Sequence, residues 1–544
     1  INATNYFAGG SFSYTTNTYD EANGNITQTS TNNNNIETAT TTTVFGTFGT
    51  PVASKPTSIV ACNTRAGQAG YCVATSFGYN SLGQLTSKTD FSTSAKPVYT
   101  TFSYNNLGNQ VAVAITPYQM STRTTTTTFD SKGRFPVNSV NPMNQTAPAA
   151  TTYDPKWGLP LTKTGINGFS TTFTYDAFGR LLTTTFPTGF TITDSYGFDV
   201  SAIEGTVHFH KTAHPGKPDV KVWYDVLDRE RKTETEGFQN QAIVQKTSYD
   251  ARGNVLTTTT PYKTGEAILT TINTYDIYNR PTQATNSLNT TVLSYSYASG
   301  NLTTTTSIGP GSPMQVTSKT VDPAGKIIGA TDDGGSLTYS YFSNGKIKEV
   351  KNGSTTLDAF EYNDHAQQTK ITDINSGVTQ CTYDALEQMT LQVSALGQTT
   401  TFSYNLLGQK ISRVGPEGTT NYYYNTSGAA INKPVLTQNF NGKYEDYTYD
   451  SFGRLKDQTF SIDGTSNRTT FIYDIYDNVI SALYSPSGFE VKYEYDANGY
   501  MQYIKNASTT NPVTLWANNG MNGFRQVTNY TLGNTKSSTN TGLS

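Results

Sequence analysis

The sequence predicts an all-β fold, built as one long strip of β-hairpins. Two observations lead to this prediction. An aromatic residue, followed by Asp or Asn and by Gly three residues later, returns at intervals of roughly 20 to 28 residues. The stretches between these motifs are rich in Thr, Tyr and other strand-forming residues. A period kept over hundreds of residues indicates one supersecondary unit copied many times.

Each copy of the motif predicts a tight turn between two strands. In one copy Asp176 opens a four-residue turn and Gly179 closes it, as type I turns prefer. The Asp side chain can accept a hydrogen bond from the backbone two residues on, and Gly tolerates the left-handed conformation of a bulge. The flanking stretches 170–175 and 180–186 are rich in β-branched and aromatic residues. The repeating unit is therefore predicted to be a β-hairpin.

The motif residues are interpreted as structural, since some twenty copies cannot all be catalytic. Two variants keep the register with Asp228 and Asn279 in place of Gly, and an early copy from Tyr19 to Gly24 has one extra residue. The clearest turns are Tyr79 with Gly83, Tyr104 with Gly108, Tyr175 with Asp176 and Gly179, Tyr249 with Asp250 and Gly253, Tyr404 with Gly408, Tyr449 with Asp450 and Gly453, and Tyr495 with Asp496 and Gly499.

Composition excludes several classes of function. The net charge is −3 and the pI is near 5.9, and Lys and Arg are dispersed, so no nucleic-acid partner is predicted. No apolar run is long enough to predict a membrane span. Hydrophobic residues make up 35% and charged residues 14%, with 37 tyrosines. Tyrosine combines a large contact area with a polar tip, which suits thin sheets wetted on at least one face.

The longer pattern Tyr-Asp-x-x-Gly-Arg-Leu occurs at 175–181 and 449–455. It resembles the YD repeat of Rhs (rearrangement hotspot) proteins, which also occurs in the C components of insecticidal ABC toxin complexes and in teneurins. The resemblance covers roughly residues 70 to 510. It implies a spiralling strip of YD-repeat hairpins that forms a hollow shell or barrel. In the bacterial members this shell holds a toxic C-terminal domain of the same polypeptide.

Simple geometry also favours a hollow shape. About twenty hairpins give about forty strands, which at about 4.8 Å spacing make a strip roughly 190 Å long and, wound once, a ring roughly 60 Å across. A barrel of about eight strands is already just filled by its own side chains. A propeller or a flat sandwich could use the same strands without a cavity.

Three regions are predicted. Residues 1–70 form an Asn/Thr-rich capping or irregular segment, residues 71–510 the YD/Rhs-repeat β-shell, and residues 511–544 a segment leading toward an Rhs core that is missing, as is a toxin domain. Since the chain begins at Ile1 without Met, we expect a piece of a longer protein. The stretch 322–325 matches the core's Asp-Pro-x-Gly hallmark but lies within the repeats, so no protease role is assigned to it.

Cysteine and histidine provide few candidate sites. A disulfide between Cys62 and Cys72 is plausible in an exported protein, and the alternative is two unpaired thiols. Cys381 is expected to be a small buried hydrophobe. His208 and His210 share a strand face and are weak candidates for metal ligands, while the alternative is a polar strand face.

No catalytic motif is present, and no cofactor is predicted. The pair Asp332 and Asp333, followed by two glycines, is interpreted as a turn. We therefore predict a non-enzymatic shell, secreted or on the surface of a bacterium, that encapsulates a C-terminal toxin or other cargo. Secretion-apparatus or capping proteins are expected as further partners. The alternative is an adhesin or carbohydrate-binding repeat protein with glycans as partners. A third hypothesis, a hydrolase, requires a cleft with two facing carboxylates.

Overall fold

The computed structural model describes residues 3–6, 12–21, 24–46, 54–199, 205–533 and 537–539. Regular structure in these ranges is antiparallel β-structure, with one short 3-10 helix, η3 (Phe238–Asn240), and no α-helix. The prediction of an all-β fold is confirmed. The early motif at Tyr19–Gly24 falls partly outside the described ranges, because they do not include Ala22 and Asn23.

The chain divides into two compact units, and each contains two separate stretches of sequence. Unit 1 combines residues 1–145 with residues 290–419, and unit 2 combines residues 146–289 with residues 420–544. Within each unit we call the earlier stretch the first row and the later stretch the second row.

In unit 1 the first row contains β1 (Ala3–Tyr6), β2 (Phe12–Tyr19), β3 (Ile26–Asn33), β4 (Glu37–Gly46), β5 (Lys55–Arg65), β6 (Tyr71–Tyr79), β7 (Leu85–Asp90), β8 (Val98–Tyr104), β9 (Gln110–Pro117), β10 (Arg123–Phe129) and β11 (Pro136–Val140). Its second row contains β25 (Thr290–Ala298), β26 (Asn301–Gly309), β27 (Gln315–Val321), β28 (Ile327–Asp332), β29 (Gly335–Tyr341), β30 (Ile347–Asn352), β31 (Thr355–Tyr362), β32 (Gln368–Asp373), β33 (Gly377–Tyr383), β34 (Met389–Val393), β35 (Thr399–Tyr404) and β36 (Lys410–Gly415).

In unit 2 the first row contains β12 (Thr152–Tyr153), β13 (Pro160–Thr164), β14 (Ser170–Tyr175), β15 (Leu181–Thr185), β16 (Thr191–Phe198), β17 (His208–Ala213), β18 (Val220–Tyr224), β19 (Glu230–Glu236), η3, β20 (Ala242–Tyr249), β21 (Val255–Thr259), β22 (Tyr262–Lys263), β23 (Thr270–Tyr275) and β24 (Pro281–Thr285). Its second row contains β37 (Gly418–Tyr424), β38 (Pro434–Asn439), β39 (Tyr444–Tyr449), β40 (Leu455–Ile462), β41 (Thr465–Tyr473), β42 (Val479–Ser485), β43 (Phe489–Tyr495), β44 (Met501–Asn506), β45 (Val513–Met521), β46 (Val527–Leu532) and β47 (Ser537–Thr539).

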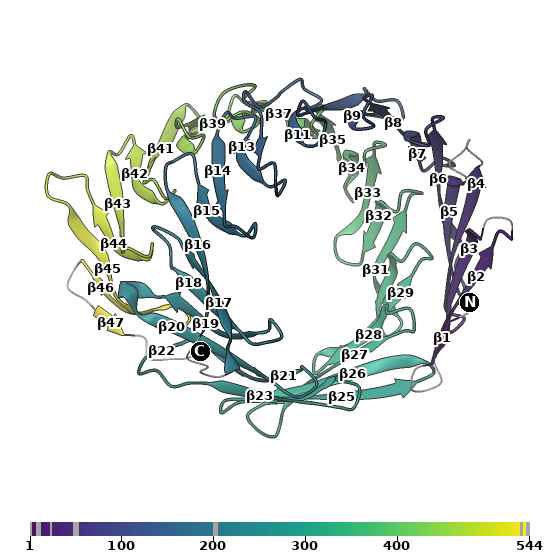
Figure 1. The fold of residues 1–544 in the computed structure, drawn as a ribbon, viewed down its shortest axis with the longest axis horizontal. Coiled ribbons are helices and arrows are strands. Elements are labelled where there is room, and N and C mark those ends of the chain that lie inside the picture. Colours follow the sequence, from purple (N-terminus) through teal and green to yellow (C-terminus); the bar gives the residue numbers. More distant parts are fainter. Residues whose placement is uncertain are drawn as a thin grey trace. The chain divides into compact units, whose positions relative to one another are not determined.

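Strands follow one another in sequence order along each row, joined by short hairpin connections (Figure 1). The exception is near β20, which also pairs with β22, while β21 pairs with β23. The motif turns therefore lie along one edge of a row, which we call the turn edge, and the other connections lie along the opposite loop edge. The strand order is linear, and no described pairing joins the first strand of a row to its last. The strip is therefore not closed into a barrel by hydrogen bonds.

The first 70 residues, for which we expected a cap or an irregular segment, contain the long strands β2 to β5. Threonine side chains explain part of the pairing here and elsewhere, because their hydroxyls bond across neighbouring strands. Examples are Thr15 with Thr31 and Thr303 with Thr320, at 2.9 and 2.8 Å. Such cross-strand pairs stabilise a sheet without requiring an apolar core. The division into three domains stays a prediction.

Few side chains are fully buried in this thin fold. Among the described residues the buried hydrophobic side chains include Phe190, Phe238 and Tyr341. All three lie near contacts between the two rows of their unit. The small core therefore lies mainly where the rows meet, and not along the middle of a sheet.

Candidate functional site: repeat turns and row seams

The motif turn is held by the side chain of its second residue. Asp176 Oδ1 accepts hydrogen bonds from the backbone N–H groups of Phe178 and Arg180, at 2.8 and 2.9 Å. The Gly179 N–H bonds back to the Asp176 carbonyl at 3.1 Å, and Gly179 has a φ of 81°. A register shift follows at Tyr175, which pairs with Leu181. One carboxylate oxygen thus holds both the turn and the bulge beside it.

The residue four positions after Asp or Asn completes the turn with a complementary side chain. Arg180 Nε donates to Asp176 Oδ2 at 2.7 Å, and Arg454 does the same to Asp450 at 2.8 Å. Burial opposes ionisation of both carboxyls, but the hydrogen bonds from these arginines outweigh it and lower the pKa of Asp176 and of Asp450. The sequence pattern Tyr-Asp-x-x-Gly-Arg therefore encodes an internal ion pair.

Other copies of the turn replace the ion pair with two amides. In unit 1, Asn80 Oδ1 accepts from the backbone N–H groups of Leu82 and Gln84 at 3.0 and 2.9 Å, and Asn80 Nδ2 donates to Gln84 Oε1 at 2.8 Å. The same Asn–Gln pair recurs between Asn405 and Gln409. The turn needs an oxygen at one position and a matching partner four residues later, and charge is optional.

The motif tyrosine connects each hairpin to the one before it. Tyr175 Oη donates to the carbonyl of Pro160 at 2.9 Å, and Pro160 is the residue that pairs with the preceding motif tyrosine, Tyr153. Tyr495 Oη reaches the carbonyl of Val479 in the same way, opposite Tyr473. The same bond is made by Tyr104, Tyr249, Tyr275, Tyr341, Tyr383, Tyr404, Tyr449 and Tyr473. We call this series the tyrosine ladder.

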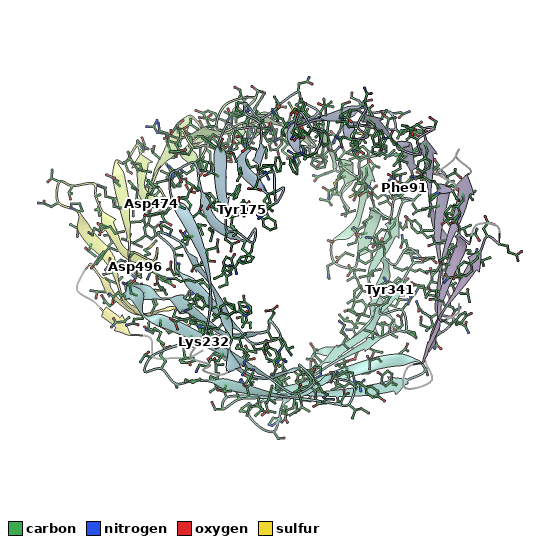
Figure 2. All side chains as sticks on the ribbon, viewed as in Figure 1. Phe91, Tyr175, Lys232, Tyr341, Asp474 and Asp496 are labelled. Carbon is green, nitrogen blue, oxygen red and sulfur yellow. A yellow bond between two sulfur atoms is a disulfide. The ribbon has the colours of Figure 1, made fainter. Side chains whose placement is uncertain are left out.

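In unit 1 the rows meet at a buried cluster of charged groups. Arg65, at the loop edge of the first row, forms ion pairs with Asp322 and Glu37, the latter at 3.0 Å. The Arg65 backbone N–H donates to Ser343 Oγ at 3.0 Å, and its guanidinium lies over the ring of Tyr341 (Tyr341 is labelled in Figure 2). Asp322 is the first residue of the Asp-Pro-x-Gly match and also holds its own turn through Lys326 N–H. Its carboxylate therefore serves the turn and the contact between rows together.

A second contact in unit 1 is aromatic. His365, at the tip of a second-row turn, stacks on Phe91 with ring centroids 3.7 Å apart. His365 Nε2 lies 3.2 Å from Ser94 Oγ. Both Phe91 and Ser94 belong to the connection between β7 and β8 on the loop edge of the first row. The turn edge of the second row therefore rests on the loop edge of the first, and we call this contact the seam.

Unit 2 has a seam of the same kind, built from amide and backbone groups. Asn498 Nδ2 donates to the Gly237 carbonyl and to Asn240 Oδ1, both at 2.9 Å. Tyr500 Oη donates to the Glu236 carbonyl at 3.0 Å, and Asp496 Oδ2 accepts from the Gln239 N–H at 3.0 Å (Asp496 is labelled in Figure 2). Again a second-row turn docks on a first-row loop.

Glycine is required in this seam for close approach as well as for backbone conformation. Gly499 has a φ of 75°, and a Cβ atom at this position would collide with the backbone of Gly216. Gly253 occupies the same motif position in the first row with a φ of 88°, and a Cβ there would meet only the far end of the Arg229 side chain. Identical motif positions thus carry different steric demands.

The seams of both units join residues that are separated by similar lengths of sequence. The partners Arg65–Ser343 and Ser94–His365 in unit 1 are 278 and 271 residues apart. Gly237–Asn498 and Glu236–Tyr500 in unit 2 are 261 and 264 residues apart. Other seam bonds extend this range to 257 and 293 residues. The offset is therefore similar, and not identical, along the two seams.

The weak metal candidates are engaged with different partners. His210 Nε2 lies 2.8 Å from Asp194 Oδ1 and its ring stacks on Tyr196. His208 lies 3.4 Å from Asp228 Oδ1 and stacks on Tyr224. Within the described ranges no group of three or more His, Cys, Asp or Glu side chains is arranged to hold a metal ion.

Cys62 and Cys72 are directly opposite each other on β5 and β6 and form a disulfide with Cα atoms 4.1 Å apart. Asp332 opens the turn to Gly334, whose N–H donates to Asp332 Oδ1 at 2.8 Å, and both Asp332 and Asp333 are exposed. Cys381 is unpaired and half-buried, and burial raises the pKa of its thiol.

The hydrolase hypothesis requires a pair of facing carboxylates. The structure contains one such pair that was not recognised in the sequence. Asp358 and Asp373 lie directly opposite on β31 and β32. Burial and the hydrogen bond to Asp373 raise the pKa of Asp358, while backbone N–H groups of Ser376 and Asn375 lower the pKa of Asp373. Since Asp373 also holds its own turn through these N–H groups, we interpret the pair as structural.

Comparison with known proteins agrees with this geometry. Residues 153–191 match the family described as RHS Repeat, and residues 324–511 match the family described as Teneurin YD-shell. The two matches cover one stretch of turns with ion pairs and one long stretch of the second rows. The chain therefore contains Rhs/YD repeats in these residues.

Solved structures show where the fold of this Rhs/YD-repeat chain occurs. It is similar to the crystal structure of TcdB2-TccC3, with a TM-score of 0.80 and 12% identity over 99% of this chain and 38% of that one. The same complex without its hypervariable C-terminal region has a TM-score of 0.82 and 11% identity, with 99% and 40% covered. A Tc holotoxin pore from Photorhabdus luminescens has a TM-score of 0.79 and 10% identity, with 98% and 39% covered.

These structures establish the YD-shell type of fold, and the Rhs/YD-repeat chain spans about two fifths of their length. No curated protein matches its sequence. In the part of the chain that the structure describes, no helix is long and apolar enough to cross a membrane.

Some functional contacts left no readable signal in the sequence. The seam partners of Arg65 and of His365 lie 257 and 271 residues away in the sequence. The tyrosine ladder did leave a signal. Phe would fill the same space, so repeated use of Tyr at the motif's first position indicates a hydroxyl with a fixed partner.

Proposed function

We propose that this Rhs/YD-repeat chain is a section of a non-enzymatic shell that encloses and shields a cargo domain for export or delivery. The observation that carries the proposal is the seam. In both units a turn edge docks on a loop edge, with partners 257 to 293 residues apart. A strip that seats each row on the last can build a continuous wall from thin sheets.

The chemistry of the repeats supports a structural role. Motif carboxylates and amides are used to hold turns, as Asp176 and Asn80 are. The motif tyrosine hydroxyls are used in the ladder between hairpins, as in Tyr175 and Tyr495. These groups are therefore not free for proton transfer. The same use of the hydroxyls removes the main argument for a carbohydrate-binding surface, which relied on free tyrosine tips.

The structures with the same fold support a cargo of the toxin class. One of them is named as a Tc holotoxin pore, and another is the TcdB2-TccC3 complex without its hypervariable C-terminal region. A separable C-terminal region in those proteins fits a cargo that follows the shell in the same polypeptide. Further chains of the same assembly would act as capping partners.

The disulfide supports a secreted or cell-surface location. Cys62 and Cys72 are joined across two neighbouring strands. Structural disulfides persist in oxidising compartments and are rare in reducing ones. An exported shell needs no metal or cofactor for the role that we propose.

Limited proteolysis of the full-length protein tests the proposal. The cargo domain should be cut much more slowly within the full-length protein than when it is expressed alone, at the same protease concentration. Mild denaturation of the full-length protein should remove this protection. Cleavage of the cargo at equal rates in both forms would rule out shielding.

A further inference from the structure

The disulfide in unit 1 joins a well-supported strand to a weakly supported one. β5 pairs with β4 along its whole length, so it has a strand on each side. β6 pairs with β7 only from Ser76 onward, and in the described ladders residues 71–73 therefore have β5 as their one neighbour. The bond between Cys62 and Cys72 lies in this stretch. It fixes the weakly supported end of β6 to a strand that is held on both sides.

The end of β6 forms part of the unit 1 seam. Tyr71 Oη donates to the carbonyl of Asp364, in a second-row turn, at 2.9 Å. Beside this bond lies a cavity of about 440 Å³, lined by residues 69–71 of the first row and by second-row residues that include Phe342 and Tyr362. The seam is therefore not closely packed around Tyr71. Its bond to the second row depends on where the end of β6 is held.

Arg65 lies on the other strand of the same hairpin and is held independently of the disulfide. It pairs with Glu37 on β4, and the Glu37 carboxylate also forms an ion pair with the Arg65 guanidinium at 3.0 Å. These contacts keep Arg65 in place, together with its bond to Ser343, when the disulfide is broken. Tyr71 has no such support, so its seam bond should be the one that the disulfide controls.

We propose that the disulfide between Cys62 and Cys72 is a redox-sensitive latch of the unit 1 seam. Cys72 is exposed and Cys62 half-buried, so a small dithiol can reach the bond. The dithiol supplies two electrons and two protons, the S–S bond breaks to give two thiols, and the dithiol becomes a disulfide. Reduction then releases the end of β6 and opens the seam beside Tyr71. This latch goes beyond the proposed shell function and does not depend on any cargo.

Proteolysis of the chain with Cys381→Ser, which leaves Cys62 and Cys72 as its only cysteines, tests the latch. Treatment with dithiothreitol, without denaturant, should raise the count of free thiols from zero to two. The thiols are then blocked with iodoacetamide and the reductant is removed. Chymotrypsin should cut after Tyr71 about tenfold faster or more than in the oxidised chain, because cleavage follows the population of the open form. Cleavage after Phe91 by chymotrypsin and after Arg65 by trypsin should change by less than about twofold.

The matched control carries Cys62→Ser with Cys72→Ser and needs no reductant or blocking. It should be cut after Tyr71 as fast as the reduced chain. If it loses its circular-dichroism signal, hydrogen exchange of residues 71–73 in the reduced, unblocked chain replaces it and should be faster than in the oxidised chain. A disulfide that dithiothreitol does not reduce without denaturant would overturn the proposal. So would an unchanged cleavage rate after Tyr71, or equal acceleration at Tyr71, Phe91 and Arg65.

Discussion

Units 1 and 2 contain the same kind of turn and the same kind of seam, but different side chains form them. In unit 1 several motif turns are neutral Asn–Gln pairs, such as Asn80 with Gln84, and the seam carries the buried ion pairs of Arg65. In unit 2 several turns are Asp–Arg pairs, such as Asp176 with Arg180, and amide groups such as Asn498 hold the seam. The geometry is common to both, so it depends on hydrogen-bond complementarity and not on charge.

This difference between the units predicts which changes should destabilise each of them most. A charge at an exposed turn is easily screened and contributes little, whereas a buried charge requires its partner. Unit 1 should therefore be most vulnerable at its seam charges. Unit 2 should be most vulnerable to steric changes at its seam and to acid at its turns.

The largest effect is expected from Arg65→Met. Asp322 and Glu37 would then be left buried without their cation, and removing one partner of a buried pair costs about 3 to 5 kcal/mol. The free energy of unfolding, measured with urea, should fall by that amount.

The matched control is Arg134→Met, which removes an exposed ion pair to Asp130 in a unit 1 turn. It should leave the stability nearly unchanged. Equal losses for Arg65→Met and Arg134→Met would show that burial of the charge in the seam does not matter.

The next largest effect compares two glycines that occupy the same motif position in unit 2 but have different steric surroundings. Gly253→Ala should cost about 1 to 2 kcal/mol for a left-handed alanine. Gly499→Ala should cost about 1 to 3 kcal/mol more, because its Cβ would collide with the backbone of Gly216 in the seam. Both values come from denaturant unfolding of the two variants. Equal costs would mean that the rows do not approach as closely as described.

A smaller effect tests the tyrosine ladder, which both units share. Tyr404→Phe in unit 1 and Tyr449→Phe in unit 2 each remove one hydroxyl bonded to a backbone carbonyl. Each should cost about 0.5 to 1.5 kcal/mol, with similar values in the two units. The thermal midpoint of each variant provides the comparison. A cost in one unit only would show that the ladder is not a common feature.

The smallest effect is expected from acid. Acid should weaken the Asp–Arg turns such as those of Asp176 and Asp450 and leave the Asn–Gln turns unchanged. The pKa values of Asp176 and Asp450 lie below the usual value of 3.8. Their stabilising contribution is therefore complete above the unfolded pKa and is lost as the pH falls through the lower folded pKa. Hydrogen exchange near pH 3 should show faster exchange at the N–H groups of Arg180 and Arg454 than at those of Gln84 and Gln409, after correction for intrinsic rates.

The amides of Gln84 and Gln409 are the built-in controls, because their acceptors, Asn80 and Asn405, do not titrate. Equal loss of protection in both sets would mean that acid acts on the fold as a whole. An unchanged ratio between pH 7 and pH 5 is also expected, since both values lie above the window in which these carboxyls titrate.

The local structure could be predicted because the residues that determine each hairpin turn lie within that hairpin. Asp176 and Gly179 are close in sequence to every group that they hold in the turn, so turn chemistry alone predicts them. The seam could not be predicted in this way. The sequence around Arg65 does not distinguish this buried arginine from exposed ones, and its partner Asp322 is 257 residues away. Which edges meet depends on the number of repeats per row, and no single repeat contains that information.

The central claim is that second-row turns dock on first-row loops with a similar offset in both units. Oxidative cross-linking of cysteine pairs tests it directly, in a chain with Cys381→Ser. The pairs Ser94→Cys with His365→Cys in unit 1, and Asn240→Cys with Asn498→Cys in unit 2, replace side chains that contact each other. Both should form disulfides within one chain in nearly full yield. The off-register pair of Ser94→Cys with Leu407→Cys, two turns further along the second row, should form none. Failure of either in-register pair, or equal cross-linking of the off-register pair, would contradict the account.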